Sequence, residues 1–159
     1  MKNEIERKFF VRQLPFLEGI QPLHYERYIL SKDEDKEVRI QKVNDTYTYE
    51  EKSSVSDLER TRTKKEITKE EFEAIKAESN GKAVIRDRYN IGSNPEIAIQ
   101  VYHGDFEGLV RAEVEFDTEE EATVFKPLDW MGEEMTGLPI ARDATLIELS
   151  KSELDEYLR

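Results

Sequence analysis

Charged and apolar side chains alternate along residues 4–11, which read EIERKFFV. Successive side chains of a β-strand point to opposite faces, so a strand here places Glu4, Glu6 and Lys8 together on one face. The opposite face, which includes Phe9, is more apolar. The chain therefore opens with a strand whose one face is a row of charges.

Seven further runs alternate with the same period of two and are separated by turn signals, such as those at residues 44–45 and 92–95. The runs are residues 25–30, 37–43, 47–52, 60–67, 84–91, 96–102 and 109–116. Together with the first run they predict about eight mostly antiparallel strands, joined largely as hairpins.

Helices are predicted where a Ser/Thr-x-x-Glu capping box precedes a suitable segment. Such boxes open at Thr68, Thr118 and Ser150. The first helix is expected to run to about Glu78 and the second through Phe125. The fold class is therefore α+β, dominated by its sheet.

Composition excludes several classes of protein. The 159 residues suffice for a single domain, predicted over residues 1–159, with 37% hydrophobic and 38% charged residues. There is no apolar stretch near the ~20 residues of a membrane helix, and the first residues do not resemble a signal peptide. A cytoplasmic location is expected. The net charge of −12 argues against nucleic-acid binding, and the absence of cysteine excludes thiolate chemistry.

The charged residues of the other strands also fall in register on one face. The members that share this face are Arg39 and Gln41, Glu50 and Lys52, Arg86 and Arg88, and Arg111, Glu113 and Glu115. In an ordinary half-buried sheet this face is simply solvated. If the sheet instead closes into a barrel, the same groups surround a central channel and the apolar faces are covered by helices and loops.

A charged channel of this kind supports a specific chemistry. Converging arginines and lysines match the oxygens of a polyphosphate chain, and arginine binds them bidentately. Glutamate pairs from different strands offer the hard oxygen ligands that Mg²⁺ or Mn²⁺ prefers. A divalent metal there would offset charge during phosphate transfer.

These residues resemble a known family. Residues 4–9 resemble the E-x-E-x-K signature of CYTH domains, also called triphosphate tunnel metalloenzymes. Further similarity lies in residues 37–40, 66–72, 86–89, 102–116 and 130–136, in the family's order and spacing over nearly the whole chain. The resemblance implies an eight-stranded antiparallel barrel with a charged tunnel and a few flanking helices.

The resemblance also implies roles for individual residues and a divalent metal, Mg²⁺ or Mn²⁺. The implied catalytic residues are Glu4, Glu6 and Lys8, and the implied metal ligands are Glu4, Glu6, Glu113 and Glu115. The implied phosphate-binding residues are Lys8, Arg39, Lys52, Arg62, Arg86, Arg88 and Arg111. The expected partner is a small molecule that contains a triphosphate, and the protein is expected to be a monomer or homodimer without nucleic-acid or membrane partners.

The sequence also departs from the family pattern. Ala98 and Gln100 stand where short bacterial members carry an acidic pair, Lys64 replaces a glutamate, and Gln41 replaces an arginine. With Arg111 added before the last glutamate pair, the tunnel has fewer carboxylates and more cations. Phosphate binding is thus more firmly predicted than hydrolysis.

Three functions remain open at this point. The first is a metal-dependent hydrolase, a triphosphatase acting on inorganic tripolyphosphate or on an organic or nucleoside triphosphate. The second is an adenylyl cyclase of class IV type that makes cyclic AMP from ATP. The third is a polyphosphate- or nucleotide-binding module without catalysis, which Ala98, Gln100 and Lys64 favour.

Single residues outside these rows carry less information. Arg142 is expected either at the tunnel mouth or in a surface salt bridge. His24 and His103 are far apart in the sequence and follow no partner pattern, so no catalytic role is expected for either.

Overall fold

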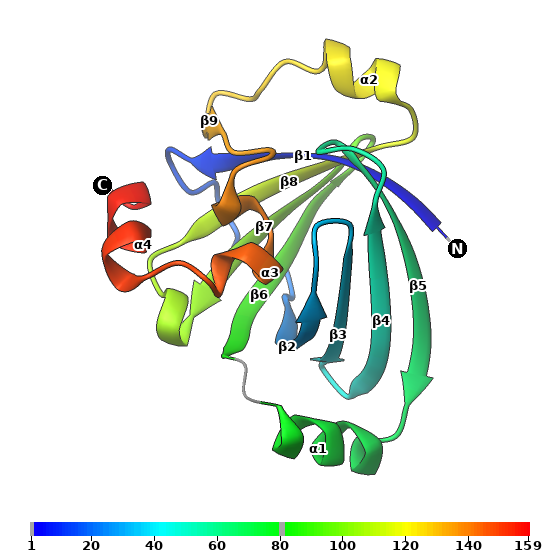
Figure 1. Ribbon diagram of the computed structural model, residues 1–159. Coiled ribbons are helices and arrows are strands. Elements are labelled where there is room, and N and C mark those ends of the chain that lie inside the picture. The colour runs from blue at the N-terminus through cyan, green and yellow to red at the C-terminus, as the bar shows by residue number, and fades with distance from the viewer. Residues whose placement is uncertain (1, 80–81) are drawn as a thin grey trace.

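The computed structural model describes residues 2–79 and 82–159, and of Lys2 only the backbone. Over these residues the chain forms nine strands in one antiparallel sheet (Figure 1). The strands are β1 (Lys2–Val11), β2 (Leu23–Lys32), β3 (Lys36–Val43), β4 (Thr46–Ser54), β5 (Glu59–Ile67), β6 (Ala83–Ser93), β7 (Glu96–His103), β8 (Val110–Phe116) and β9 (Met131–Glu134). The eight runs of alternating residues are all strands, whereas β9 lies in a segment that was not predicted as a strand.

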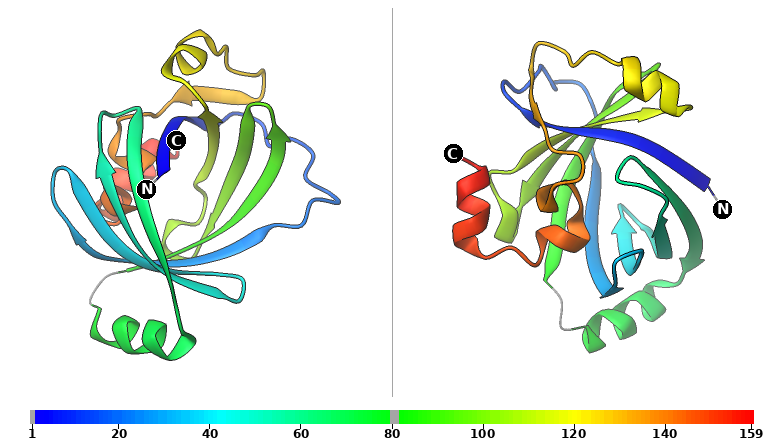
Figure 2. Two further views of the ribbon diagram at one scale, coloured as in Figure 1. Left: turned by 90° about the vertical axis from the view of Figure 1, so that its right-hand side faces the viewer. Right: turned by 45° about the horizontal axis from the view of Figure 1, so that its top comes forward.

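The sheet closes on itself because β1 has a partner on each side. The pairing order runs β5-β4-β3-β2-β6-β7-β8-β1, and β1 also pairs with β5. Beyond the contact with β5, β9 pairs with the same edge of β1 at Phe9 and Val11. Figure 2 shows the strands curving around a common axis. The predicted eight-stranded antiparallel barrel is therefore confirmed over the described residues.

The short strand β9 lies unusually close to β1. At Gly132 an added Cβ would meet Cβ and the carbonyl oxygen of Phe10 at 3.3 Å each. A glycine allows this close approach because it has no Cβ. The register between β1 and β9 is also irregular.

Four α-helices occur among the described residues, and none is long and apolar enough to cross a membrane. They are α1 (Lys69–Glu78), α2 (Glu119–Val124), α3 (Asp143–Leu146) and α4 (Lys151–Tyr157), with 3₁₀ turns η1 (Gly104–Phe106) and η2 (Pro139–Ala141). The predicted capping boxes at Thr68 and Ser150 are complete. At Thr118 the hydroxyl caps α2, but the reciprocal bond of a capping box is not made, because this hydroxyl itself donates to the Glu121 carboxylate.

The apolar faces of the barrel strands point outward and are covered by helices or loops. Ile40 and Tyr28 pack against Phe72 of α1, which lies below the strands in Figure 1. On β1 and β8, Phe9 and Val114 belong to a second cluster that the segment around α2 and β9 covers. The hydrophobic core therefore surrounds the barrel, and its interior is left to polar side chains.

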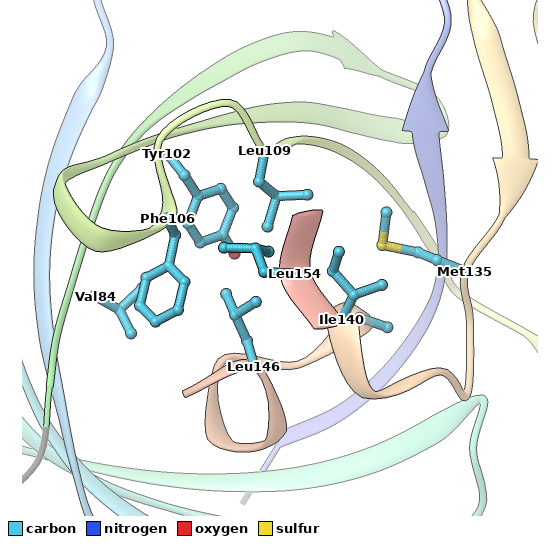
Figure 3. Close-up of a cluster of buried hydrophobic side chains, with 9 residues drawn as sticks. Val84, Tyr102, Phe106, Leu109, Met135, Ile140, Leu146 and Leu154 are labelled. Atoms are coloured by element: carbon cyan, nitrogen blue, oxygen red, sulfur yellow. The ribbon is translucent and has the colours of Figure 1, made fainter. Parts of the chain in front are cut away.

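A third apolar cluster attaches the C-terminal segment to the barrel (Figure 3). Leu146 of α3, Leu154 of α4 and Ile140 of η2 meet Tyr102 and Leu109, which come from the β7–β8 hairpin. All five side chains are buried. This packing holds Arg142 and Asp143, at the start of α3, where their side chains reach into the barrel interior.

Candidate active site

The inward-facing side chains surround a cavity of about 710 Å³ inside the barrel. All residues for which the sequence implied a role line it, namely Glu4, Glu6, Lys8, Arg39, Lys52, Arg62, Arg86, Arg88, Arg111, Glu113 and Glu115. The charged rows therefore face an enclosed space rather than solvent. The alternative of a solvated outer face is wrong.

Positive charge dominates this cavity. Of the described residues that line it, eleven are lysine or arginine and seven are glutamate or aspartate. The whole chain, by contrast, carries a net charge of −12. An anion is therefore repelled by most of the protein and attracted by this one interior, where low-dielectric walls strengthen the attraction.

The cavity has a more exposed end and a buried end. The side chains of Arg62 and Arg88 are 23% and 24% exposed. Those of Arg39, Arg86 and Arg111 are only 2–3% exposed. Arg142, which also lines the cavity, is 25% exposed. Donors are therefore accessible at Arg62, Arg88 and Arg142, and less so at the buried arginines.

Two of the four glutamates implied as metal ligands are held by basic neighbours. Glu4 Oε1 lies 2.8 Å from Lys52 Nζ, and Glu113 Oε2 lies 2.9 Å from Arg111 Nη2. Burial alone would raise the pKa of Glu4, but Lys52 and Arg62 outweigh burial and lower this pKa to about 2. Both carboxylates are ionised at neutral pH, and their charge is already compensated.

The other two glutamates lie opposite each other on neighbouring strands. In the register of β1 and β8, Glu6 is the direct partner of Glu115, and Glu96 of β7 is the next partner in the same row. Like charges in such positions repel, and a bound cation relieves the repulsion. Among the described residues, no three acidic or histidine side chains converge on one point as a preformed metal centre. The donors nevertheless suit a divalent cation, since they are carboxylate oxygens facing the cavity where phosphate oxygens can complete the coordination.

Burial lowers the pKa of two lysine residues that line the cavity. Lys8 Nζ donates to the carbonyl oxygen of Ala141 at 2.9 Å, and burial lowers its pKa from 10.5. Burial also lowers the pKa of Lys52, and repulsion from Arg39 adds to this effect, so that the pKa of Lys52 is about 8. An anion that binds beside either amine would stabilise the protonated form of that lysine.

Several charged residues of the cavity had no role in the sequence-based predictions. Glu37 of β3 accepts from Arg60 Nη2 at 2.7 Å and from Arg142 Nη2 at 3.0 Å. Arg142 therefore lies in the cavity and pairs with a buried carboxylate, rather than in a surface salt bridge. Glu37 follows the alternation that marks Arg39, which is the signal that could have identified it.

Two glutamines that stand where the family pattern has charged residues form hydrogen bonds between charged groups. The amide oxygen of Gln100 accepts from Arg86 Nη1 at 2.6 Å, and its amide nitrogen lies 3.4 Å from Glu113 Oε1. Gln41 accepts from Arg27 and donates to Glu50 at 2.8 Å. These amides pair buried charges without adding any charge of their own.

The two histidines meet on the outer surface of the barrel. Asp87 lies 2.5 Å from His24 Nδ1 through one carboxylate oxygen and 3.1 Å from His103 Nε2 through the other. They share a partner that the sequence did not reveal, but none of the three lines the cavity.

Comparisons with known proteins agree with this geometry. No family model matches the chain. An inorganic triphosphatase of Nitrosomonas europaea is 32% identical over 138 residues, which are 84% of this chain and 89% of that protein. An inorganic triphosphatase of Acetivibrio thermocellus is 32% identical over 152 residues, 93% of this chain and 95% of that protein.

Solved structures show the same fold. The crystal structure of an inorganic triphosphatase superposes with a TM-score of 0.70 at 25% identity and covers 94% of this chain and 97% of its own. A Bacillus halodurans protein solved as a candidate adenylate cyclase gives a TM-score of 0.57 at 19% identity, over 78% of this chain and 87% of its own, which shows the shared fold alone. With two relatives above 30% identity over most of their length, the chain belongs to the inorganic triphosphatase family.

Proposed function

We propose that this protein is a triphosphatase of the CYTH type, which hydrolyses a linear triphosphate in its barrel with Mg²⁺ or Mn²⁺ as cofactor. The observation that carries the proposal is the cavity itself, where eleven basic side chains face one space inside an acidic protein. Its relatives named inorganic triphosphatase make tripolyphosphate the first substrate to test.

The basic residues bind and orient the phosphate chain. The ion pairs of Arg62 are long, at 3.7 Å to Glu4 and 3.9 Å to Glu50, so its donors can turn to phosphate oxygens. Arg88 donates to Asn90 through Nε at 3.1 Å, but its Nη1 lies 3.6 Å from Glu113 and can turn in the same way. Lys52 contributes a positive charge, and a bound phosphate would stabilise the protonated form of this amine. Binding in this space fixes the chain and replaces its water shell with oriented donors.

Hydrolysis transfers the terminal phosphoryl group to water. Water attacks the terminal phosphorus, the bond from that phosphorus to the bridging oxygen breaks, and orthophosphate and pyrophosphate are the products. Negative charge grows on the bridging oxygen, and the arginines that surround the chain stabilise it.

Glu6 and Glu115 would hold the divalent cation, together with Glu4 and Glu113. When bound, the cation offsets phosphate charge and polarises the group under attack. These glutamates would hold it from β1 and β8, which are neighbouring strands of the closed barrel.

The variant Glu6→Gln tests the proposal. It removes one carboxylate charge from the row of Glu6 and Glu115, and we expect Mg²⁺- or Mn²⁺-dependent phosphate release from tripolyphosphate to fall by about 100-fold or more, because a catalytic metal contributes several kcal/mol. The matched control is Glu51→Gln on the outer face of β4, where the carboxylate pairs with Lys36 at 3.2 Å. The control should retain wild-type turnover.

Two outcomes would contradict the proposal. One is a Glu6→Gln variant that turns over like the wild type. The other is a wild-type protein that releases no phosphate from tripolyphosphate, thiamine triphosphate or ATP with either metal. Chromatography of the ATP reaction separates hydrolysis from cyclisation, because a cyclase releases pyrophosphate and cyclic AMP.

A further inference from the structure

A carboxylate from the C-terminal segment fills the buried end of the cavity. Asp143, the first residue of α3, has a fully buried side chain. Its Oδ2 accepts from Arg27 Nη1 at 2.9 Å and from Arg86 Nε at 3.2 Å, while its Oδ1 accepts from the Tyr102 hydroxyl at 2.7 Å. Arg111 Nη2 lies 3.6 Å from the same Oδ1. One carboxylate thus holds three guanidinium groups.

The three arginines around Asp143 are tightly paired, unlike Arg62, which is more exposed. Arg27 also donates to Gln41 at 2.9 Å, and Arg111 donates to Glu113 at 3.0 Å. By contrast, the ion pairs of Arg62 with Glu4 and Glu50 span 3.7 and 3.9 Å. The donors around Asp143 are therefore engaged, and those of Arg62 can turn to a ligand.

We propose that Asp143 sets the length of the phosphate chain that the cavity accepts. Its carboxylate occupies the place that one more phosphate group of a longer chain would take among Arg27, Arg86 and Arg111. This inference rests on the proposed function for its ligand class, the linear polyphosphates.

Charge is the physical reason. A phosphate group that advanced to the buried end would meet an ionised carboxylate at close range, where the low dielectric strengthens repulsion. It would also compete with Asp143 for donors that are already engaged. A chain held by the outer cations can therefore extend inward only as far as Asp143 permits.

The same contacts admit a purely structural explanation, in which Asp143 only attaches the C-terminal segment to the barrel. The two explanations differ in one measurable quantity. If Asp143 only attaches the C-terminal segment, its loss should lower the affinity for polyphosphates of all lengths by a similar factor. If Asp143 limits polyphosphate length, its loss should raise the affinity for longer polyphosphates relative to shorter ones. The ratio of affinities for two chain lengths therefore separates them.

The experiment uses Asp143→Asn, which removes the charge and keeps the shape. Dissociation constants for tripolyphosphate and tetrapolyphosphate are measured by calorimetry without divalent cations, for the variant and the wild type. We expect the affinity for tetrapolyphosphate relative to tripolyphosphate to rise by about tenfold, the effect of one additional charge-assisted hydrogen bond. An unchanged ratio overturns the proposal.

Two further variants serve as a control and as an alternative to Asp143→Asn. Glu148→Gln is the matched control: it removes one charge from the same C-terminal segment, where Glu148 pairs with Lys32 outside the cavity, and the ratio should not change. If Asp143→Asn does not fold, Tyr102→Phe removes the hydroxyl that holds the carboxylate. A smaller rise in the ratio then supports the proposal, and no rise overturns it.

Failure of this inference is distinguishable from failure of the proposed function. The calorimetric ratio requires neither a metal nor turnover. If the ratio shifts in a protein that hydrolyses no triphosphate, Asp143 limits chain length in a binding protein, and only the hydrolytic proposal falls. If hydrolysis is observed and the ratio is constant, only the role of Asp143 falls.

Discussion

Lys52 shows how one residue makes the cavity sensitive to pH. Burial opposes its charge, and the nearby guanidinium of Arg39 opposes it further, while Glu6 and Glu4 favour it. The net effect lowers the pKa of Lys52 from 10.5 to about 8. An amine with this pKa changes its charge in a range where most lysines remain protonated.

The affinity for tripolyphosphate should therefore fall as pH rises from 7 to 9. Below pH 8 Lys52 is charged and should attract phosphate, and above pH 8 the free protein loses this charge and should bind roughly tenfold more weakly at pH 9. Calorimetry at several pH values, with Lys52→Met as the control, measures the effect. The control removes the lysine but not the titration of the ligand. If both proteins show the same pH profile, Lys52 is not the group responsible.

The same pKa fixes the sign of a stability effect. Between pH 8 and about 10.4 the unfolded chain still holds the lysine proton that the folded chain has lost, so the unfolded state binds more protons. The contribution of Lys52 to the free energy of unfolding therefore becomes more favourable as pH rises through this window. Binding and stability respond to this one residue in opposite directions.

At the scale of elements, the barrel depends on helices that cover its outer faces. Helix α1 packs against β3 and β4, and Phe72 is its buried residue. The ring centroid of Phe72 lies 5.1 Å from that of Tyr47 and 6.1 Å from that of Tyr28. The inner faces of these strands carry charged side chains. The outer contacts therefore supply much of the apolar burial that stabilises the strands.

Phe72→Ala should destabilise the protein without altering its cavity. Removal of this buried ring should lower the free energy of unfolding by about 3–5 kcal/mol, measured by urea denaturation. Tripolyphosphate affinity of the folded variant should be unchanged, because Phe72 does not line the cavity. Glu73→Ala, at an exposed position of the same helix, is the control and should change stability by less than about 0.5 kcal/mol. Equal effects of both variants would contradict the assigned role of α1.

At the scale of the whole molecule, charge is separated into an acidic exterior and a basic interior. Buried carboxylates keep the interior from excessive self-repulsion. Burial opposes the charge of Glu50, but Arg39 and Arg27 outweigh burial and lower its pKa to about 2, as Lys52 does for Glu4. Neighbouring arginines likewise hold the pKa of Asp143 well below its usual range, against the effect of burial.

The protein should therefore lose stability in acid below about pH 4.5. As pH falls from 4.5 toward 2, the unfolded chain takes up protons that Glu4 and Glu50 do not yet bind in the folded chain, so the free energy of unfolding decreases. Urea midpoints at pH 7, 5, 4 and 3 measure this loss. Glu50→Gln should be less stable at pH 7 and depend less on pH in acid. A midpoint that is constant from pH 5 to pH 3 would contradict this prediction.

The strands, the principal helices and the charged face could be predicted from the sequence. A strand alternates with period two and a capping box spans four residues, so both are readable from neighbours in the chain. Glu4, Glu6, Arg88 and Glu115 were placed in the cavity for this reason. Resemblance to the CYTH family added the closure of the barrel, which alternation alone left open.

Features that depend on contacts between distant residues could not be predicted and became visible in the folded protein. Asp143 joins Arg27, Arg86 and Tyr102 across more than forty positions of the chain in each case. Strand β9 likewise exists as a partner of β1, and its short sequence lacks a periodic pattern. A buried ion pair cannot be recognised in the local sequence pattern, because its partners are distant in the sequence and come together only on folding.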